Sequence, residues 1–541
     1  MSIRQRSGSS PIPFHPLLSP LPPLLTVLNA NLYLVRPAAV FRPYFLALTC
    51  VALGWGFLAC LTGSLRKSAV VATLLTTATL SEFMWAPYRA GPIPVAWLVW
   101  AAVGAVCCVV LRRGGDLYGL TVFSNLVGVF TTALLAWPGV WGAMTQPSPH
   151  PRSGYLHSLK IEATLAPDAM PDVYVLILDG YGRDDVLRAV YGYPNPFASE
   201  LRSLDFYIAE AAASNYSQTA QSVASMLNVD YLSALLSEAD PGFTSRTGLG
   251  SLIADSRVFR AFRSAGYRVV VYESEYQLVR PEPADVALRP AIHLTDFEYG
   301  VYEGTVLPRF CRWLGRPPSW PTHLAHRYQV NWVLDRLTSG PVADGRPTLV
   351  FAHILLPHPP FVFGPQGEYR PTPLPGTFAD GDEWRFDAQG TGENYVVGYV
   401  AGLRFLNGRL STLVRRLTET SGRPAIIYLQ GDHGPGSRLY WDAPSASDLR
   451  ERLGILLAMR FPDGDSPPLY PAITPVNAMR VLLNRALGSR LPPLEDRAFF
   501  AGWKRPFDLV DVTGHVRPAA TVAGSARSNR GTAGTHLAGA K

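Results

Sequence analysis

Hydrophobic and polar positions divide this chain into two parts. Before about residue 145, charged residues are sparse and long uncharged apolar runs recur. After about residue 170, short apolar runs alternate with amphipathic stretches. About 20 consecutive apolar residues suffice to cross a bilayer core. The first part therefore predicts membrane-spanning helices. The second predicts a folded domain of roughly 340 residues, long enough to bury its own core.

Five membrane spans are predicted within residues 1–144, at 14–35, 43–63, 69–87, 93–111 and 117–141. The first span contains no Lys, Arg, Asp or Glu, but it is rich in proline and includes Asn29 and Asn31. A cleaved signal peptide is the alternative for this segment, although no small-residue cleavage site stands out. Glu82 lies near the outer end of the third span, so we expect an interfacial residue there rather than a functional intramembrane carboxylate.

Basic residues in the short loops predict the orientation of these spans. Arg66, Lys67, Arg112 and Arg113 fall on one side, which should be the cytoplasm. The chain that follows the last span then lies on the opposite side, with or without the first span. We therefore expect an integral protein of the plasma (inner) membrane whose large domain lies outside the cytoplasm.

The second part divides into a connector (145–171), a domain (172–512) and a tail (513–541). The tail is rich in Ala, Gly, Thr, Ser and Arg, which predicts disorder. Apolar runs typical of strands occur at 173–178, 267–272, 348–352 and 425–429, and helical patterns occur at 258–264 and 395–417. Strands that alternate with helices predict an α/β domain with a mostly parallel sheet and helices on both faces.

Charge and cysteine content narrow the possible partners and the sources of stability. The formal net charge is +7, but only 16% of residues are charged and no Lys/Arg-rich stripe appears, so a nucleic-acid partner is not expected. The net positive charge is instead consistent with a basic domain that lies near anionic lipid headgroups or substrates. Cys311 is the only cysteine outside the predicted spans, so we expect no disulfide within the exported domain.

Two predicted strands end in residues that can bind a metal ion. Asp179 follows the run 173–178, and Asp432-His433-Gly434 follows the run 425–429. An Asp before Gly is on its own more often a turn residue. However, open α/β sheets present ligands at the carboxyl ends of their strands, and oxygen and nitrogen donors together suit zinc or manganese. We therefore predict one divalent metal site formed by Asp179, Asp432 and His433.

Two further segments carry candidate chemistry. Residues 214–226 are rich in hydroxyl groups just before a helix-like run, which is consistent with helix capping and also with a nucleophile at a helix N-terminus. A metal ion would activate such a hydroxyl by lowering its pKa. His353 and His358 follow the run 348–352 in a proline-rich loop that cannot be helical. Each is either a structural histidine or part of the same cleft.

With these four segments in this order, the chain resembles the alkaline phosphatase/sulfatase superfamily. The resemblance is to its membrane-anchored branch, which includes lipoteichoic acid synthases and lipid A phosphoethanolamine transferases, and it covers roughly residues 170–510. It implies an alkaline-phosphatase-like fold, metal binding by Asp179, Thr219, Asp432 and His433, and Thr219 as the nucleophile. The stretch 219–226, TAQSVASM, resembles the T-A-x-S-V-P-C-M type stretch of the phosphoethanolamine transferases.

The same resemblance implies that His353 and His358 contact the transferred group or a second metal ion. Ser217, two residues before Thr219, is the alternative nucleophile. The stretch Glu451-Arg452 also looks familiar from this branch.

Departures from the family pattern leave the substrate open. The C-x-P-S-R and S-x-P-S-R motifs of formylglycine sulfatases are absent, and Ala224 and Ser225 replace the Pro-Cys pair of the transferases. The expected function is metal-dependent transfer of a phospho-ester group through Thr219, from a phospholipid headgroup to an envelope glycan or lipid. A phosphate or sulfate ester hydrolase of the same superfamily is one alternative, and a non-catalytic membrane binding protein is another.

Overall fold

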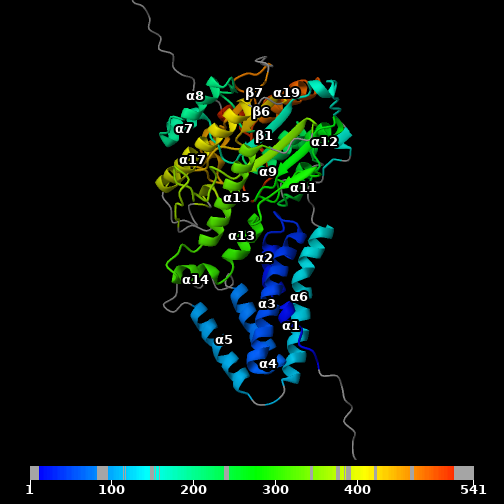
Figure 1. Cartoon of the computed structure of the whole chain (residues 1–541), viewed down its shortest axis with the longest axis vertical. Coiled ribbons are helices and arrows are strands. Elements are labelled where there is room, and N and C mark those ends of the chain that lie inside the picture. The colour runs from blue at the N-terminus through cyan, green and yellow to red at the C-terminus, as the bar shows by residue number, and fades with distance from the viewer. Residues whose placement is uncertain are drawn as a thin grey trace, which may run out of the picture.

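The structure, a computed structural model, describes residues 11–516 apart from 82–94, 114, 116, 146–150, 153, 158, 237–242, 341–344, 373–377, 383, 385–391, 420–422 and 463–467. Figure 1 shows a bundle of N-terminal helices at one end of the molecule and an α/β domain at the other. Glu82 and most of the predicted tail, from residue 517 on, lie outside the described residues.

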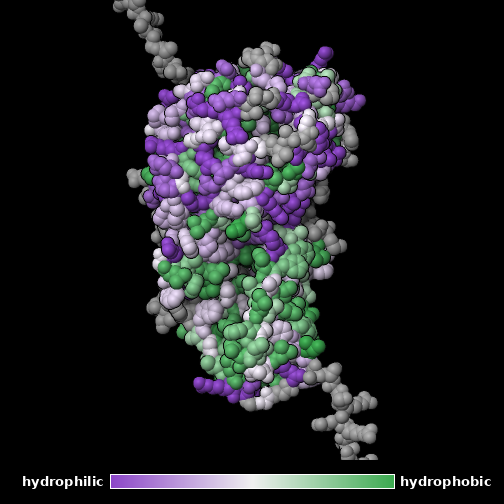
Figure 2. All heavy atoms as spheres, viewed as in Figure 1, coloured by the Kyte–Doolittle hydropathy of each residue, from purple (hydrophilic) through white to green (hydrophobic). Residues whose placement is uncertain are grey.

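The N-terminal bundle exposes apolar side chains to its surroundings. Its helices are α1 (His15–Leu18), α2 (Leu21–Ala30), η1 (Pro37–Val40), α3 (Phe41–Thr62), α4 (Leu65–Leu80), α5 (Val95–Arg112) and α6 (Tyr118–Thr145). Phe57 is 65% exposed and Phe130 68% exposed, and Figure 2 shows an apolar surface over this end of the molecule. Among the described residues, two helical segments are long and apolar enough to cross a membrane by length and composition, Pro37–Thr62 and Tyr118–Trp141.

The predicted span 14–35 is two short helices instead of one. Proline lacks the N–H that a continuing helix needs, and Pro20 stands at the N-cap of α2 with Pro22 and Pro23 in its first turn. The 10 residues of α2 cover only about 15 Å, half of a bilayer core. This helix packs against α6 and against α13 (Asp296–Glu303) of the domain.

The domain is built on a seven-stranded sheet in the order β2-β7-β6-β1-β5-β3-β4. The strands are β1 (Asp172–Leu178), β2 (Tyr207–Ile208), β3 (Arg268–Tyr272), β4 (Val286–Leu288), β5 (Thr348–Ile354), β6 (Ala425–Gln430) and β7 (Leu457–Arg460). Strands β1, β3, β4, β5 and β6 are parallel, and β7 and β2 continue the sheet antiparallel. A separate pair is formed by β8 (Phe499–Phe500) and β9 (Val510–Asp511). The four predicted strands are confirmed as β1, β3, β5 and β6.

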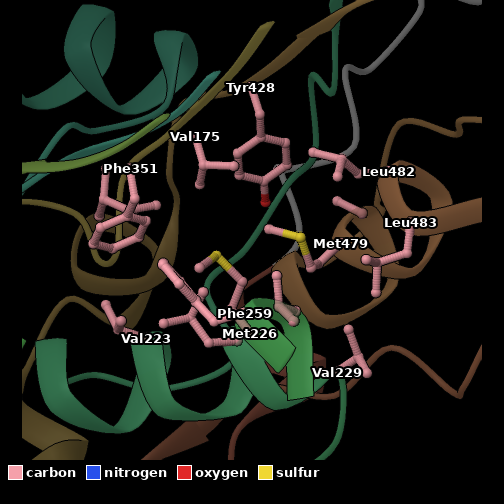
Figure 3. Close-up of a cluster of buried hydrophobic side chains, with 14 of the residues drawn as sticks. Val175, Val223, Met226, Val229, Phe259, Phe351, Tyr428, Met479, Leu482 and Leu483 are labelled. Carbon is pink, nitrogen blue, oxygen red and sulfur yellow. The ribbon is translucent and has the colours of Figure 1, made fainter. Parts of the chain in front are cut away.

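Helices cover both faces of this sheet. Alternate residues of a strand point to opposite faces. Val175 and Ile177 of β1 pack with α9 (Thr219–Asn228), α11 (Thr247–Ala254), α12 (Arg257–Ser264) and α19 (Pro475–Leu487). Leu176 and Leu178 pack with α7 (Asp184–Tyr191), α8 (Pro196–Ser203), α15 (Trp320–Ser339) and α17 (Gly392–Glu419). Figure 3 shows part of the first of these two cores, with Val175, Met226 and Phe259 among its buried side chains. The predicted mostly parallel α/β sheet with helices on both faces is confirmed.

The helices of the domain are α7 (Asp184–Tyr191), α8 (Pro196–Ser203), α9 (Thr219–Asn228), α10 (Leu232–Leu235), α11 (Thr247–Ala254), α12 (Arg257–Ser264), α13, α14 (Leu307–Trp313), α15 (Trp320–Ser339), α17 (Gly392–Glu419), α18 (Leu449–Leu453) and α19 (Pro475–Leu487). Short 3₁₀ turns are η3 (Tyr155–His157), η4 (Pro167–Ala169), η5 (Pro444–Ala446) and η6 (Thr513–His515). All five cysteines are free. The connector lies against the domain, where Thr164 N–H donates to Leu487 O at 2.8 Å.

Candidate functional site

The candidate site lies where β1 and its neighbours β5 and β6 end. Asp179 follows β1 directly, and its backbone N–H donates to Ile354 O of β5 at 2.9 Å. Gly180 then turns the chain with φ of 76°, a conformation that glycine adopts without strain. Its N–H donates to Asp432 Oδ1, beyond the end of β6, at 3.1 Å. Backbone contacts therefore hold Asp179 and Asp432 at one edge of the sheet.

All six predicted site residues meet at this edge. His353 Nε2 lies 3.3 Å from Asp179 Oδ2, and His433 Nε2 lies 3.4 Å from both Asp179 Oδ1 and Asp432 Oδ2. The Thr219 hydroxyl is 3.1 Å from His433 Nε2.

The sixth residue, His358, joins Asp179 and His433 in one set of donor atoms that all lie within 4.8 Å of one another. Asp179, His353 and Asp432 form a second such set. The two sets share Asp179. Residues brought from four distant segments therefore form one cluster.

Backbone and hydroxyl partners orient the three histidine rings. His433 Nδ1 lies 2.9 Å from Gly434 O, and His358 Nδ1 lies 2.7 Å from Pro359 O. A ring nitrogen beside a carbonyl oxygen must carry the proton, so Nε2 of both rings presents a lone pair in the neutral form. The third ring, His353, pairs its Nδ1 with the Ser274 hydroxyl at 2.8 Å.

Three buried polar atoms in this cluster lack a hydrogen-bond partner among the described residues: Asp179 Oδ1, Asp432 Oδ2 and His353 Nε2. Buried polar groups are normally satisfied, so an exception needs an explanation. One divalent cation satisfies carboxylate oxygens and an imidazole nitrogen together, and this donor set suits zinc or manganese. The residues present therefore fit a metal ion.

The local charges keep the donor groups in the forms that bind metal. Burial alone would raise the pKa of Asp179, but the neighbouring His358, His353 and His433 outweigh it and lower that pKa. Burial lowers the pKa of the His433 imidazole, with a further contribution from Arg452 that Asp432 and Asp179 oppose. Asp179 is therefore an anion and His433 a neutral ring at neutral pH.

The structure distinguishes the two candidate nucleophiles. Thr219 is the first residue of α9, and its hydroxyl faces His433. Ser217 is fully buried, and its hydroxyl donates to Ala501 O at 3.2 Å and accepts from Ala501 N–H at 3.1 Å. Ser217 therefore holds the chain near β8, whereas Thr219 faces the cluster.

A cavity of about 300 Å³ opens over the cluster. Asp179, Thr219, His358 and His433 contribute to its wall. The segment 31–35, between α2 and η1, adds Asn31, Tyr33, Leu34 and Val35. The aromatic residues that line the cavity are Tyr33, Tyr276, Phe297, Phe378, Trp441 and Trp503. The N-terminal region thus forms part of the wall around Thr219.

His353 does not line this cavity, so the two histidines differ in position. Both were expected to contact the transferred group or a second metal ion. Only His358 faces the cavity, whereas His353 lies behind it between Ser274 and Asp179. The placement follows from the strand: His353 is still part of β5, whereas His358 is in the loop beyond it.

Three residues near the site escaped the sequence analysis as functional candidates. Asp380 Oδ2 lies 2.5 Å from Arg452 Nη1 and 3.9 Å from His358 Nε2. No strand or helix pattern marks Asp380, and Arg452 was noted only as part of a familiar stretch. The third, Ser274, lies just beyond β3, so the same strand-end reasoning that selected Asp179 could have found it.

No protein-family model matches the sequence, and no curated protein matches it either. The fold is similar to the C-terminal periplasmic domain of EcEptC from Escherichia coli at 12% identity, with a TM-score of 0.38 over 66% of this chain and 97% of that one. It is also similar to lipooligosaccharide phosphoethanolamine transferase A (EptA) from Neisseria meningitidis, at 12% identity and a TM-score of 0.36, over 89% of this chain and 95% of that one. Phosphonate monoester hydrolase of Agrobacterium radiobacter is similar at 12% identity and a TM-score of 0.35, over 61% of this chain and 80% of that one.

Proposed function

We propose that this protein is a membrane-anchored, metal-dependent enzyme of the alkaline phosphatase/sulfatase superfamily that transfers or hydrolyses a phospho-ester group through Thr219. The observation that carries the proposal is the Thr219 hydroxyl, 3.1 Å from His433 Nε2 at the wall of a cavity, beside buried carboxylate oxygens that have no hydrogen-bond partner among the described residues. Folding alone gives no reason to keep unsatisfied carboxylates next to a hydroxyl at a helix N-terminus.

Asp179, Thr219, Asp432 and His433 are the proposed ligands of a zinc or manganese ion. When bound, such an ion lowers the pKa of a coordinated hydroxyl and offsets negative charge on phosphoryl oxygens. His433 can serve as a ligand because its Nδ1 proton is held by Gly434 O, which leaves Nε2 free.

In the proposed reaction, Thr219 Oγ1 attacks the phosphorus of a phosphodiester and loses its proton. A bond forms between Oγ1 and phosphorus while the bond from phosphorus to the leaving alkoxide oxygen breaks. His358 Nε2, which presents a lone pair on the cavity side, is the proposed acceptor of the Thr219 proton, and it then gives that proton to the alkoxide. A hydroxyl of an acceptor, or water, then attacks the phospho-threonine, which restores Thr219 and releases the transferred or hydrolysed group.

A phospholipid is the proposed donor, and a glycan or lipid of the cell envelope the proposed acceptor. Residues 31–35, which link two helices of the apolar N-terminal bundle, form part of the cavity wall, so a headgroup can reach Thr219 while its acyl chains stay in the membrane. Residues 1–144 are the proposed membrane region. The loop charges at Arg66, Lys67, Arg112 and Arg113 favour a catalytic domain outside the cytoplasm.

The test is the variant Thr219→Ala in the full-length protein, incubated with a phospholipid labelled in its headgroup. Turnover should be lost, whereas the bound metal and the melting temperature should stay close to those of the wild type. Full activity in this variant would sink the assignment. Thr219→Ser, which keeps a hydroxyl, serves as the matched control and should retain measurable turnover.

The same incubation separates the competing functions. Label transferred to an added envelope extract indicates a transferase, and label released to water with or without the extract indicates a hydrolase. A wild-type protein that binds no zinc or manganese when these ions are supplied, and that shows no turnover, would favour the non-catalytic binding protein instead.

A further inference from the structure

The reactive cavity contains one buried cation whose role the proposed reaction does not use. Arg452, on the short helix α18, has a side chain only 2% exposed, yet it lines the same cavity as Thr219 and His433. Its carbonyl oxygen accepts the backbone N–H of Gly434 at 2.7 Å, so the helix is tied directly to the Asp-His-Gly turn. A buried guanidinium is costly to desolvate, so its position needs a reason.

Arg452 has five N–H donors, and three hydrogen bonds engage two of its nitrogens, Nε and Nη1. Nη1 donates to Asp380 Oδ2 at 2.5 Å and to Gly434 O at 3.1 Å, and Nε donates to Ser217 O at 2.9 Å. The guanidinium carbon lies 5.0 Å from the centre of the Trp441 ring.

The third guanidinium nitrogen, Nη2, differs from Nε and Nη1. Nη2 makes no hydrogen bond within the described part of the chain, and it is not fully buried. An Nη2 that is neither bonded nor fully enclosed, on a side chain that lines the cavity, leaves two donors available to a ligand there.

Asp380 orients Arg452 without occupying this free nitrogen. Its carboxylate also accepts the Tyr395 hydroxyl at 2.7 Å, and its carbonyl accepts the Trp441 ring N–H at 3.1 Å. Burial would raise the pKa of Asp380, but Arg452, together with smaller contributions from His358, His433 and the Tyr395 hydroxyl, lowers that pKa overall, so the pair stays ionised. The planar guanidinium is thus held rigidly, and its geometry matches that of a phosphate group.

We propose that Arg452 is a further catalytic residue, whose Nη2 donates to a non-bridging oxygen of the phosphoryl group that Thr219 receives, and that Asp380 is the residue that positions it. This inference rests on the proposed function, because it names the group that binds the transferred phosphoryl. No bond to Arg452 forms or breaks. Its donors stabilise negative charge on the oxygen as the phosphorus exchanges its leaving group for Thr219 Oγ1.

The test uses the full-length protein loaded with zinc or manganese, with two readouts: phosphodiester turnover and the affinity for inorganic phosphate measured by calorimetry. Arg452→Gln should lower kcat by about 10²–10³-fold, the usual loss for one such donor, and should weaken phosphate binding at least about tenfold. Arg452→Lys should have a kcat and a phosphate affinity between those of Arg452→Gln and the wild type, because lysine keeps the positive charge but lacks the planar, two-pronged guanidinium. Bound metal should be unchanged in both variants.

Arg452→Gln leaves Asp380 as an unpaired buried carboxylate, so this variant could lose stability. The double variant Arg452→Gln/Asp380→Asn removes both charges and avoids that cost. Arg450→Gln is the matched control on the same helix, because Arg450 is 38% exposed, pairs with Asp185 and does not line the cavity. It should leave turnover and phosphate affinity unchanged.

Wild-type phosphate affinity and kcat in a folded, metal-loaded double variant would overturn the inference and leave the proposed function intact. Absence of turnover in the wild type would count against the proposed function instead. Phosphate calorimetry on the wild type and the double variant would still decide whether Arg452 binds the anion.

Discussion

Replacement of Asp432 by Asn should stabilise the metal-free protein and should reduce the further stabilisation that a metal ion gives. Asp432 Oδ1 accepts the Gly180 N–H at 3.1 Å, and Oδ2 is buried without a partner, 3.4 Å from His433 Nε2. Asn has the same size and keeps the Oδ1 acceptor. Its amide nitrogen stands in the place of Oδ2 and can donate to His433 Nε2, so a group that has a partner replaces a buried oxygen that has none among the described residues.

The magnitudes follow from these contacts. An unsatisfied buried polar atom costs about 1–3 kcal/mol, so Asp432→Asn should stabilise the metal-free protein by that amount. For a domain of this size, 1 kcal/mol corresponds to a melting shift of about 2 °C, so the expected rise is about 2–6 °C. A metal ion at 100 times its Kd stabilises the wild type by about 2.7 kcal/mol, or about 5 °C. The variant should lose most of that increment, because it lacks a charged ligand.

Thermal unfolding of the full-length protein in detergent, followed by tryptophan fluorescence, measures both effects when it is run with a chelator and with added zinc or manganese. Asp335→Asn is the control, because that side chain is 72% exposed and pairs only with Arg409 at the surface. Either of two results would refute the reasoning: a variant that melts at a lower temperature than the wild type in chelator, or a variant whose melting temperature rises as much as that of the wild type when metal is added.

Three further changes probe the supports of the site. Ser274→Ala removes the hydroxyl that orients His353, whose Nε2 lies 3.3 Å from the proposed ligand Asp179, so metal affinity measured by calorimetry should fall about tenfold; an unchanged Kd would contradict that role. Glu451 is buried, which raises its pKa from 4.5 to about 7. The folded state therefore binds more protons between these values, and stability should fall by about 3 kcal/mol as pH rises through this window. In thermal melts from pH 4 to 8, Glu451→Gln should show a smaller change of stability with pH than the wild type. A wild type whose stability does not fall between pH 4.5 and 7 would refute this prediction. Gly434→Ala places a Cβ 2.0 Å from Glu451 O, so it should cost about 3 kcal/mol or more and displace the metal ligands. The control Gly408→Ala, with nothing within 4 Å on α17, should stabilise by up to about 1 kcal/mol in the same melts.

The sequence allowed prediction of those site residues whose position depends on strand ends. Asp179, His353 and Asp432 lie in or just after parallel strands, so an apolar run followed by a polar side chain was enough to place them at one edge. The strands themselves are buried and rich in β-branched residues, a signal that depends only on neighbouring positions.

Residues placed by tertiary contacts could not be predicted in this way. Asp380 lies between β5 and α17, outside any periodic segment, and it reaches His358 only because Arg452 and Tyr395 hold its carboxylate. The predicted span 14–35 was wrong as a single helix for a related reason. A count of apolar residues ignores the missing N–H of proline, and here Pro20 separates α1 from α2.

The charges around the cavity suggest that the metal ion also governs substrate entry. The carboxyl groups of Asp179, Asp432 and Asp380 contribute −3 and the Arg452 guanidinium +1, which leaves −2 on these four side chains, enough to repel a phosphodiester that itself carries −1. A divalent cation brings the four side chains to neutrality. Burial raises the pKa of a further cavity residue, Asp296, to about 7, so near neutral pH that carboxyl group adds only part of a charge. In a neutral cavity the unbonded Nη2 of Arg452 becomes an attractive donor for the entering anion. The proposed metal ligands and the proposed anion-binding arginine therefore depend on each other, since either group alone leaves the phosphoryl oxygens without adequate stabilisation.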